Sequence, residues 1–209
     1  MRKVELKNGE FYHIYNRGVD KREVFLDKFD YLRFFKSLKE FNRIEAIGSI
    51  YLQSFKKEFS LRNQVPKLVE IVAYCLNPNH YHLILKQVEK RGVEKFMHKV
   101  GVGYSNYFNN KYKRSGSLFQ GTFKAINIDS DEYLLYLSAY VNKNKFIHGY
   151  KNKFDFSSLD EYIGKADYEL CDKDIILKQF RSKKEYVQYL KINAKYLKNK
   201  KELARYLME

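Results

Sequence analysis

Residues 67–88 read KLVEIVAYCLNPNHYHLILKQV, and this stretch decides the fold. Residues 67–76 are mostly apolar, which predicts a strand that is buried on both faces. The NPN at residues 77–79 is a turn signal. After the turn the side chains alternate, so His80 and His82 lie on the same face of a second strand. The stretch therefore predicts a β-hairpin with two imidazoles projecting from one side of a sheet.

The sequence on either side of the hairpin alternates between strand patterns and helix patterns. Aromatic and β-branched runs predict strands, and apolar residues at helical spacing predict helices. Asp27 and the DSDE at residues 129–132 suit the first turns of two of these helices. The predicted elements are a strand at 10–17, a helix at 28–41, a helix at 92–112, a strand at 123–128 and a helix at 131–145.

This order of elements predicts the fold class. A strand, a helix, a hairpin, a second helix, a last strand and a last helix indicate an α+β fold of the ferredoxin-like kind. We expect a four-stranded antiparallel sheet with helices packed on one face. Residues 46–65 fit no element clearly and are read as either a β excursion or a loop insertion.

The composition changes after Tyr150. An acidic, polar stretch is followed at 178–201 by a run rich in lysine, in which apolar residues recur at helical spacing. This pattern predicts a basic amphipathic helix, either exposed as a tail or packed back on the core. We therefore divide the chain into a domain at 1–150 and a basic, mainly helical C-terminal extension at 151–209.

The charge of the chain indicates its partner. The 209 residues include 40 Lys and Arg against 25 Asp and Glu, a formal net charge of +15, which attracts polyanions. The 19 Tyr and 16 Phe offer rings that stack on unpaired bases, so nucleic acid is the expected partner. Two cysteines exclude a disulfide scaffold and a Cys-rich zinc module. With no membrane-length apolar run and no signal peptide, we expect a soluble, cytoplasmic protein with no membrane partner.

Two pairs of residues are candidates for metal binding and catalysis. His80 and His82 form a side-by-side imidazole pair that suits a divalent metal, although such a pair also occurs as ordinary buried histidines. Tyr140 and Asn144 are four residues apart on the last predicted helix, so their Cβ atoms lie about 5–6 Å apart. Asn144 offers a carbonyl oxygen to a hard cation, and Tyr140 offers a phenol. Since this helix has other tyrosines, spacing alone does not choose among them.

Four segments of the chain resemble one family. Residues 77–85, NPNHYHLIL, resemble the HUH motif (His, bulky hydrophobe, His) of the single-tyrosine transposases. Residues 12–18, YHIYNRG, are similar to the first strand of that family in its REP-associated tyrosine transposase branch. Residues 116–124, GSLFQGTFK, resemble the branch's GxLWQGxFK segment, with Phe119 in place of Trp.

The fourth segment corresponds to the family's nucleophile helix. Residues 140–144, YVNKN, resemble its Tyr-Ile-x-x-Asn motif, but Lys145 stands where the family has proline. The resemblance spans residues 10–150, and its segments occur in the family's order, which makes the match specific.

The resemblance implies a DNA transposase of the HUH endonuclease kind, which cuts and rejoins single-stranded DNA in DNA transposition and recombination. His80 and His82 would bind Mg²⁺ or Mn²⁺, with Asn144 as the third metal ligand. Tyr140 would attack the scissile phosphate and form a 5′-phosphotyrosine intermediate. The implied substrate is single-stranded or hairpin DNA.

Other polar residues are candidates for contact with DNA. His13 is expected on the same sheet surface as the histidine pair, unless it is a partly buried histidine bonded to backbone. His98 and His148 have no partner in the sequence and are expected at the surface. The candidate DNA-binding residues are His13, Arg17, Arg114, Lys124 and Lys143.

Two other functions remain open from the sequence. One is a non-catalytic module that binds single-stranded nucleic acid on the same fold, and the other is an HUH replication initiator. Monomer and homodimer are likewise both open, and with them whether Tyr140 serves its own histidine pair or that of a partner.

Overall fold

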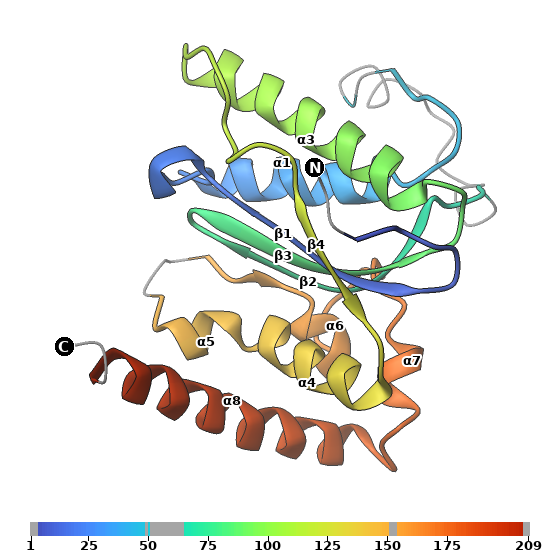
Figure 1. Ribbon diagram of the computed structural model, residues 1–209, viewed down its shortest axis with the longest axis vertical. Helices are drawn as coiled ribbons and strands as arrows, with labels where there is room; N and C mark the ends of the chain where they lie inside the picture. Colours follow the sequence, from blue (N-terminus) through green and yellow to red (C-terminus); the bar gives the residue numbers. More distant parts are fainter. Residues whose placement is uncertain (1–3, 49, 51–64, 151–153, 207–209) are drawn as a thin grey trace.

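An antiparallel sheet forms the centre of the molecule. The computed structural model describes residues 4–48, 50, 65–150 and 154–206, without the side chains of 202–206. The sheet has the strand order β4-β1-β3-β2-β5 (Figure 1). Its strands are β1 (Phe11–Arg17), β2 (Val69–Asn77), β3 (His80–Gln87), β4 (Lys124–Ile128) and β5 (Phe156–Ser157).

The predicted hairpin is present at the middle of this sheet. β2 and β3 are antiparallel, with Asn77 opposite His80 and Cys75 opposite His82. β1 pairs with the other edge of β3, so that Tyr15 lies opposite His82. The strands predicted at 10–17 and 123–128 are confirmed as β1 and β4. Paired residues share a face of the sheet, and this pairing therefore sets which side chains meet.

Two helices cover the first face of the sheet. They are α1 (Lys28–Glu40) and α3 (Gly92–Lys111) (Figure 1). Asp27 caps α1 as predicted, because its carboxylate accepts a hydrogen bond from the backbone of Asp30 and the Asp30 carboxylate accepts one in return. Gly103 in the middle of α3 allows close packing, since a Cβ there would lie 2.7 Å from the ring of Phe41.

Helices also cover the second face, which corrects the sequence prediction of helices on one face. They are α4 (Asp131–Asn142), α5 (Asn144–His148), α6 (Leu159–Ile163) and α7 (Asp174–Leu177), and α8 (Lys183–Tyr206) lies outside α4 and α5, away from the sheet (Figure 1). The sheet also has a fifth strand, because the short β5 pairs with β2. The physical reason is visible in β2 and β3, whose residues are buried on both faces and so need two layers of cover.

The last predicted helix is divided in two. α4 ends at Asn142, and α5 begins at Asn144 after Lys143 leaves the helical region with φ −111° and ψ 12°. Ser130 caps the start of α4 by accepting a hydrogen bond from the backbone of Tyr133, as the capping signature predicted.

The basic amphipathic helix predicted in the C-terminal extension is α8, and it packs against α4 and α5. Its buried side chains include Leu190, Ala194 and Leu197, whereas most of its lysines are exposed. None of the described helices is long and apolar enough to cross a membrane. Most of the unclear stretch at 46–65 lies outside the described residues.

Candidate active site

One face of the sheet brings together the histidines of β1 and β3 and the tyrosine of α4. The rings of His80 and His82 are perpendicular, with centroids 5.0 Å apart. The ring of Tyr140 stands edge-on to that of His82 at 5.4 Å. His80 and His82 are buried, as is Asn144 at the start of α5. The juxtaposition expected from the sequence is therefore present within a single chain.

The hydrogen bonds of His80 fix which nitrogen carries its proton. Nδ1 of His80 lies 2.7 Å from Oδ1 of Asn79, whose amide is oriented because its Nδ2 donates to the carbonyl of Lys21 at 3.0 Å. An amide oxygen only accepts, so Nδ1 of His80 donates. Nε2 of His80 therefore holds the lone pair, and Nδ2 of Asn77 donates to it at 3.0 Å.

His82 is held by a second histidine. Its Nδ1 lies 2.9 Å from Nε2 of His13, and the two rings are stacked. When Nδ1 of His82 donates to His13, Nε2 of His82 keeps its lone pair, and the ring of Tyr140 lies 5.4 Å from that of His82. A histidine whose second nitrogen is held in this way is the usual arrangement of a metal ligand.

All three imidazoles are held neutral. Burial lowers the pKa of His13 to about 4 and that of His80 to about 3. The positive charge of Arg17 lowers the pKa of His80 further. The pKa of His82 is also well below its ordinary value, again chiefly through burial. Because the neutral form of imidazole is the one that binds metal ions, the pair is ready to act as a ligand at neutral pH.

Asn144 completes a donor set that fits a cation. Its Oδ1 accepts a hydrogen bond of 2.9 Å from Nδ2 of Asn77, the same nitrogen that contacts His80. Thus Nε2 of His80 and Oδ1 of Asn144 converge on one point. Nδ2 of Asn144 is buried and has no hydrogen-bond partner among the described residues. The described residues contain no group of three His, Cys, Asp or Glu side chains suited to a metal, so any ion at this place depends on the asparagine.

Tyr140 differs from the other tyrosines of α4 in what it faces. Its Oη lies 3.2 Å from Nε2 of His148. Burial raises the pKa of the Tyr140 phenol, and the neighbouring side chain of Asn144 opposes that rise. Tyr136 and Tyr140 both pack against Ile147 and the buried residues of α8, but Tyr140 also has its ring 5.4 Å from that of His82. Of these two tyrosines, Tyr140 is the one beside the histidine pair.

His148 was expected at the surface, and that prediction is wrong. Its ring is half-buried, stacks on Tyr150 at 5.7 Å and accepts a hydrogen bond at Nδ1 from Lys201 Nζ at 2.7 Å. Burial lowers the pKa of His148 to about 4, and the charges of Lys201 and Arg17 contribute. The missed signal is a spacing of four, since Tyr140, Asn144 and His148 follow one another at that interval. His98, by contrast, is exposed as expected.

Two of the candidate DNA-binding cations lie on the face of the histidine pair. Arg17 is exposed at the end of β1, where it lies opposite His80. Lys124 begins β4 opposite Tyr15, and its Nζ lies 5.9 Å from the centre of the Tyr15 ring. Both cations flank the histidines, and their exposed charges are available to phosphates.

The structure does not bring the other two cations to the histidine pair. Arg114 donates to Oδ1 of Asn109 at 2.7 Å and to the carbonyl of Ser117, next to α3 on the first face of the sheet. Lys143 has Asp155 and Lys191 as its electrostatic neighbours, and burial lowers its pKa.

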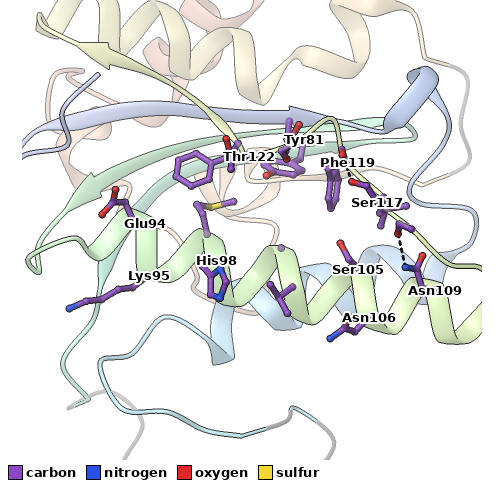
Figure 2. Close-up of a pocket in the computed structure, with 18 of the residues that line it drawn as sticks. Tyr81, Glu94, Lys95, His98, Ser105, Asn106, Asn109, Ser117, Phe119 and Thr122 are labelled. Carbon is purple, nitrogen blue, oxygen red and sulfur yellow. Dashed lines mark hydrogen bonds between the residues drawn. The ribbon is translucent and has the colours of Figure 1, made fainter. Parts of the chain in front are cut away.

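A groove on the first face is separate from this site. Figure 2 shows it between α3 and the segment that leads into β4. Its volume is about 710 Å³, and Tyr81 and Phe119 are part of its lining. Because Tyr81 alternates with His80 and His82 along β3, the sheet separates the groove from the histidine pair.

Comparison with known proteins agrees with the resemblance seen in the sequence. The chain is similar to a solved structure described as the REP-associated tyrosine transposase bound to a REP hairpin, with 14% identity and a TM-score of 0.53. The match covers 81% of this chain and 88% of the other, and it shows a common fold. No curated protein matches the chain.

A family model described as "Transposase IS200 like" matches residues 12–144, which is more than half of the sequence. The chain therefore belongs to the family of IS200-like transposases.

Proposed function

We propose that this protein is a metal-dependent endonuclease and strand transferase that acts on single-stranded DNA with Tyr140 as its nucleophile. The proposal rests on the position of Tyr140 beside a neutral histidine pair. The centre of its ring lies 5.4 Å from the centre of the His82 ring. A binding module requires no such pairing of a partly buried phenol with imidazoles. Membership of the transposase family supports DNA cleavage as the reaction.

His80, His82 and Asn144 would hold Mg²⁺ or Mn²⁺, with water and phosphate oxygens completing the coordination. The bound cation would supply Lewis-acid stabilisation of the phosphate and hold it for in-line attack. Mn²⁺ is at least as suitable as Mg²⁺, since Mg²⁺ prefers shells made of oxygen alone. The place where His80 and Asn144 converge is now approached by the amide of Asn77, which would turn away on metal binding.

Tyr140 supplies the attacking atom. A lone pair of Oη forms a bond to phosphorus, and the bond from phosphorus to the 3′ oxygen breaks with its electron pair on that oxygen. The phenolic proton passes to water, and the 3′ oxygen takes a proton from water to become a hydroxyl. The result is a 5′-phosphotyrosine that retains the energy needed for rejoining. The reverse sequence joins a 3′-hydroxyl to the same phosphate.

The charge distribution supports DNA as the substrate. The net charge of +15 favours a polyanion, and Arg17 and Lys124 are placed beside the histidine pair to bind its phosphates. The structural relative is described as bound to a REP hairpin, so we propose hairpin DNA with a single-stranded flank for this chain. His13 would act by holding His82, whereas Arg114 and Lys143 would contact DNA away from the reacting phosphate.

One chain contains all the reacting groups of the proposed site. We therefore propose that Tyr140 acts with the histidine pair of its own chain. A homodimer remains a prediction, and mixing two inactive variants tests the alternative arrangement. A mixture of Tyr140→Phe and His82→Ala chains forms an adduct only when the tyrosine of one copy serves the histidines of another.

The test of the proposed function is covalent capture of DNA. Wild-type protein is incubated with labelled hairpin oligonucleotides and Mn²⁺, and the products are run on a denaturing gel. We expect a protein–DNA adduct that is absent with EDTA and absent in Tyr140→Phe. Tyr136→Phe is the matched control, because it removes a phenol from the same helix. An adduct in Tyr140→Phe assigns the nucleophile elsewhere, and binding without any adduct in the wild type indicates a non-catalytic module.

A further inference from the structure

Lys201 of α8 reaches the proposed nucleophile through one intermediate side chain. Its Nζ lies 2.7 Å from Nδ1 of His148. Nε2 of the same ring lies 3.2 Å from Oη of Tyr140. The three residues come from α8, α5 and α4, so the C-terminal extension meets the proposed active site at this point.

The chemistry of the Lys201 ammonium and the His148 imidazole determines which group donates in each hydrogen bond. A lysine ammonium has only donors, so Nδ1 of His148 accepts from Lys201. A neutral imidazole has one donor and one acceptor, and its proton is therefore on Nε2. His148 consequently donates to the oxygen of Tyr140. Since both ring nitrogens are used in this way, His148 has no lone pair with which to take the phenolic proton.

Packing of α8 holds Lys201 in this place. Ala194 and Leu197 are buried against Ile147 of α5, the residue next to His148. Lys201 follows Leu197 by four residues and so lies on the same side of α8. The apolar contact between α5 and α8 therefore places the ammonium group of Lys201 next to the imidazole of His148.

We propose that His148 is a catalytic residue that stabilises negative charge on Oη of Tyr140, and that Lys201 is the positioning residue that fixes its tautomer. The proposal rests on the proposed function of Tyr140. It assigns a role in the site to the C-terminal extension, beyond the attraction of its lysines for DNA.

We expect His148 to stabilise the transition state most in the rejoining step. There the 3′-hydroxyl attacks the phosphotyrosine, the new bond from its oxygen to phosphorus forms, and the bond from phosphorus to Oη breaks. The electron pair remains on Oη, which becomes a phenolate until it takes a proton from water. The hydroxyl proton passes to water. An N–H group already aimed at Oη stabilises that charge without reorganisation.

The first experiment measures the tautomer itself and does not depend on activity. Protein labelled with ¹⁵N in its histidines is studied by long-range ¹H–¹⁵N NMR without metal, with His148→Phe to assign the signals. We expect the proton of His148 on Nε2 in the wild type and a mixture of tautomers in Lys201→Met. Lys200→Met is the matched control, because Lys200 is an exposed neighbour on the same helix. An unchanged His148 spectrum in Lys201→Met overturns the role of Lys201.

The second experiment measures the rate at which isolated adduct is consumed by an oligonucleotide with a 3′-hydroxyl, at saturating DNA. Loss of one oxyanion donor costs about a hundredfold to a thousandfold in a well-formed site, so His148→Phe should slow rejoining by at least about tenfold. His148→Gln keeps a donor and should recover part of the rate. Lys201→Met should be slower than Lys200→Met, which loses the same charge.

The outcomes separate this inference from the proposed function. If wild-type protein forms no adduct on Tyr140, the proposed function fails, and the catalytic role of His148 fails with it. If the adduct forms and His148→Phe rejoins DNA at the wild-type rate with native circular dichroism, only the inference is overturned.

Discussion

The side-chain nitrogen of Asn77 lies 3.0 Å from Nε2 of His80, on the lone pair that a cation would use. The same nitrogen donates to Oδ1 of Asn144 at 2.9 Å. The thiol of Cys75 contacts Oδ1 of Asn77 and so holds the amide in this orientation. Asn77 therefore donates to two of the three proposed ligands, and these hydrogen bonds would compete with a bound ion.

Replacing Asn77 by alanine should tighten metal binding. Each buried hydrogen bond contributes about 0.5–1.5 kcal/mol, so release of the two bonds should increase Mn²⁺ affinity by roughly fivefold to a hundredfold. Titration of Mn²⁺ followed by electron paramagnetic resonance measures the change. Weaker binding in Asn77→Ala would instead mean that Asn77 turns its own oxygen to the ion.

His13 should matter to metal binding although it is not a proposed ligand. Its ring holds Nδ1 of His82 at 2.9 Å, and loss of such a partner costs about tenfold to a hundredfold in metal affinity. We expect His13→Phe to weaken Mn²⁺ binding by this amount while His80 and His82 remain in place. Tyr15→Phe is the control, since it keeps the ring that stacks on His13. Equal affinity in the wild type and His13→Phe would show that His82 needs no such support.

The stability of the metal-free protein should fall in mild acid. Burial lowers the pKa of His13 to about 4 and that of His148 to about 4, whereas the unfolded chain has ordinary histidines with a pKa near 6.5. Between these values the unfolded state binds protons that the folded state does not, so the free energy of unfolding decreases as pH falls from about 6.5 to about 4.

Urea denaturation in EDTA at pH 7 and pH 5 measures this effect. His13→Phe should lose less stability between the two pH values than the wild type does, because one buried neutral histidine has been removed. His98→Phe changes an exposed histidine and should keep the wild-type dependence. Identical losses in the wild type and His13→Phe would exclude His13 as a source of the acid sensitivity.

Much of the sheet was predictable because its signals are local. The alternation after residue 79 determines that His80 and His82 share a face, and the turn at 77–79 determines that their strand pairs with β2. The spacing of four made Tyr140 and Asn144 candidates, but the resemblance to the transposase family was needed to choose Tyr140 among the tyrosines of this helix. For the hairpin, neighbours in the sequence fix the geometry and the structure retains it, whereas the helix is interrupted at Lys143.

The features that the sequence did not predict depend on contacts between segments far apart in the chain. The sequence does not show that Lys201 of α8 folds back to His148, 53 residues away. Nor does it show that residues after Tyr150 supply β5 and the helices α6, α7 and α8 on the second face, although the apolar β2 already required cover on both faces. Such contacts are set by how whole faces pack, which no single segment reveals.

Arg17 should contribute to DNA affinity through its charge. It is exposed, lies opposite His80 and is close enough to lower the pKa of both His80 and His148. Arg17→Gln should weaken binding of a single-stranded oligonucleotide and reduce the slope of log affinity against log salt by about 0.7, the value for one phosphate contact on a single strand.

Lys39→Gln is the matched control, since Lys39 is an exposed cation on α1, on the far side of the sheet. Fluorescence anisotropy at several salt concentrations gives both slopes. If the two variants have the same slope, the DNA does not pass over the histidine face beside Arg17, and the phosphate contacts assigned to that face are wrong.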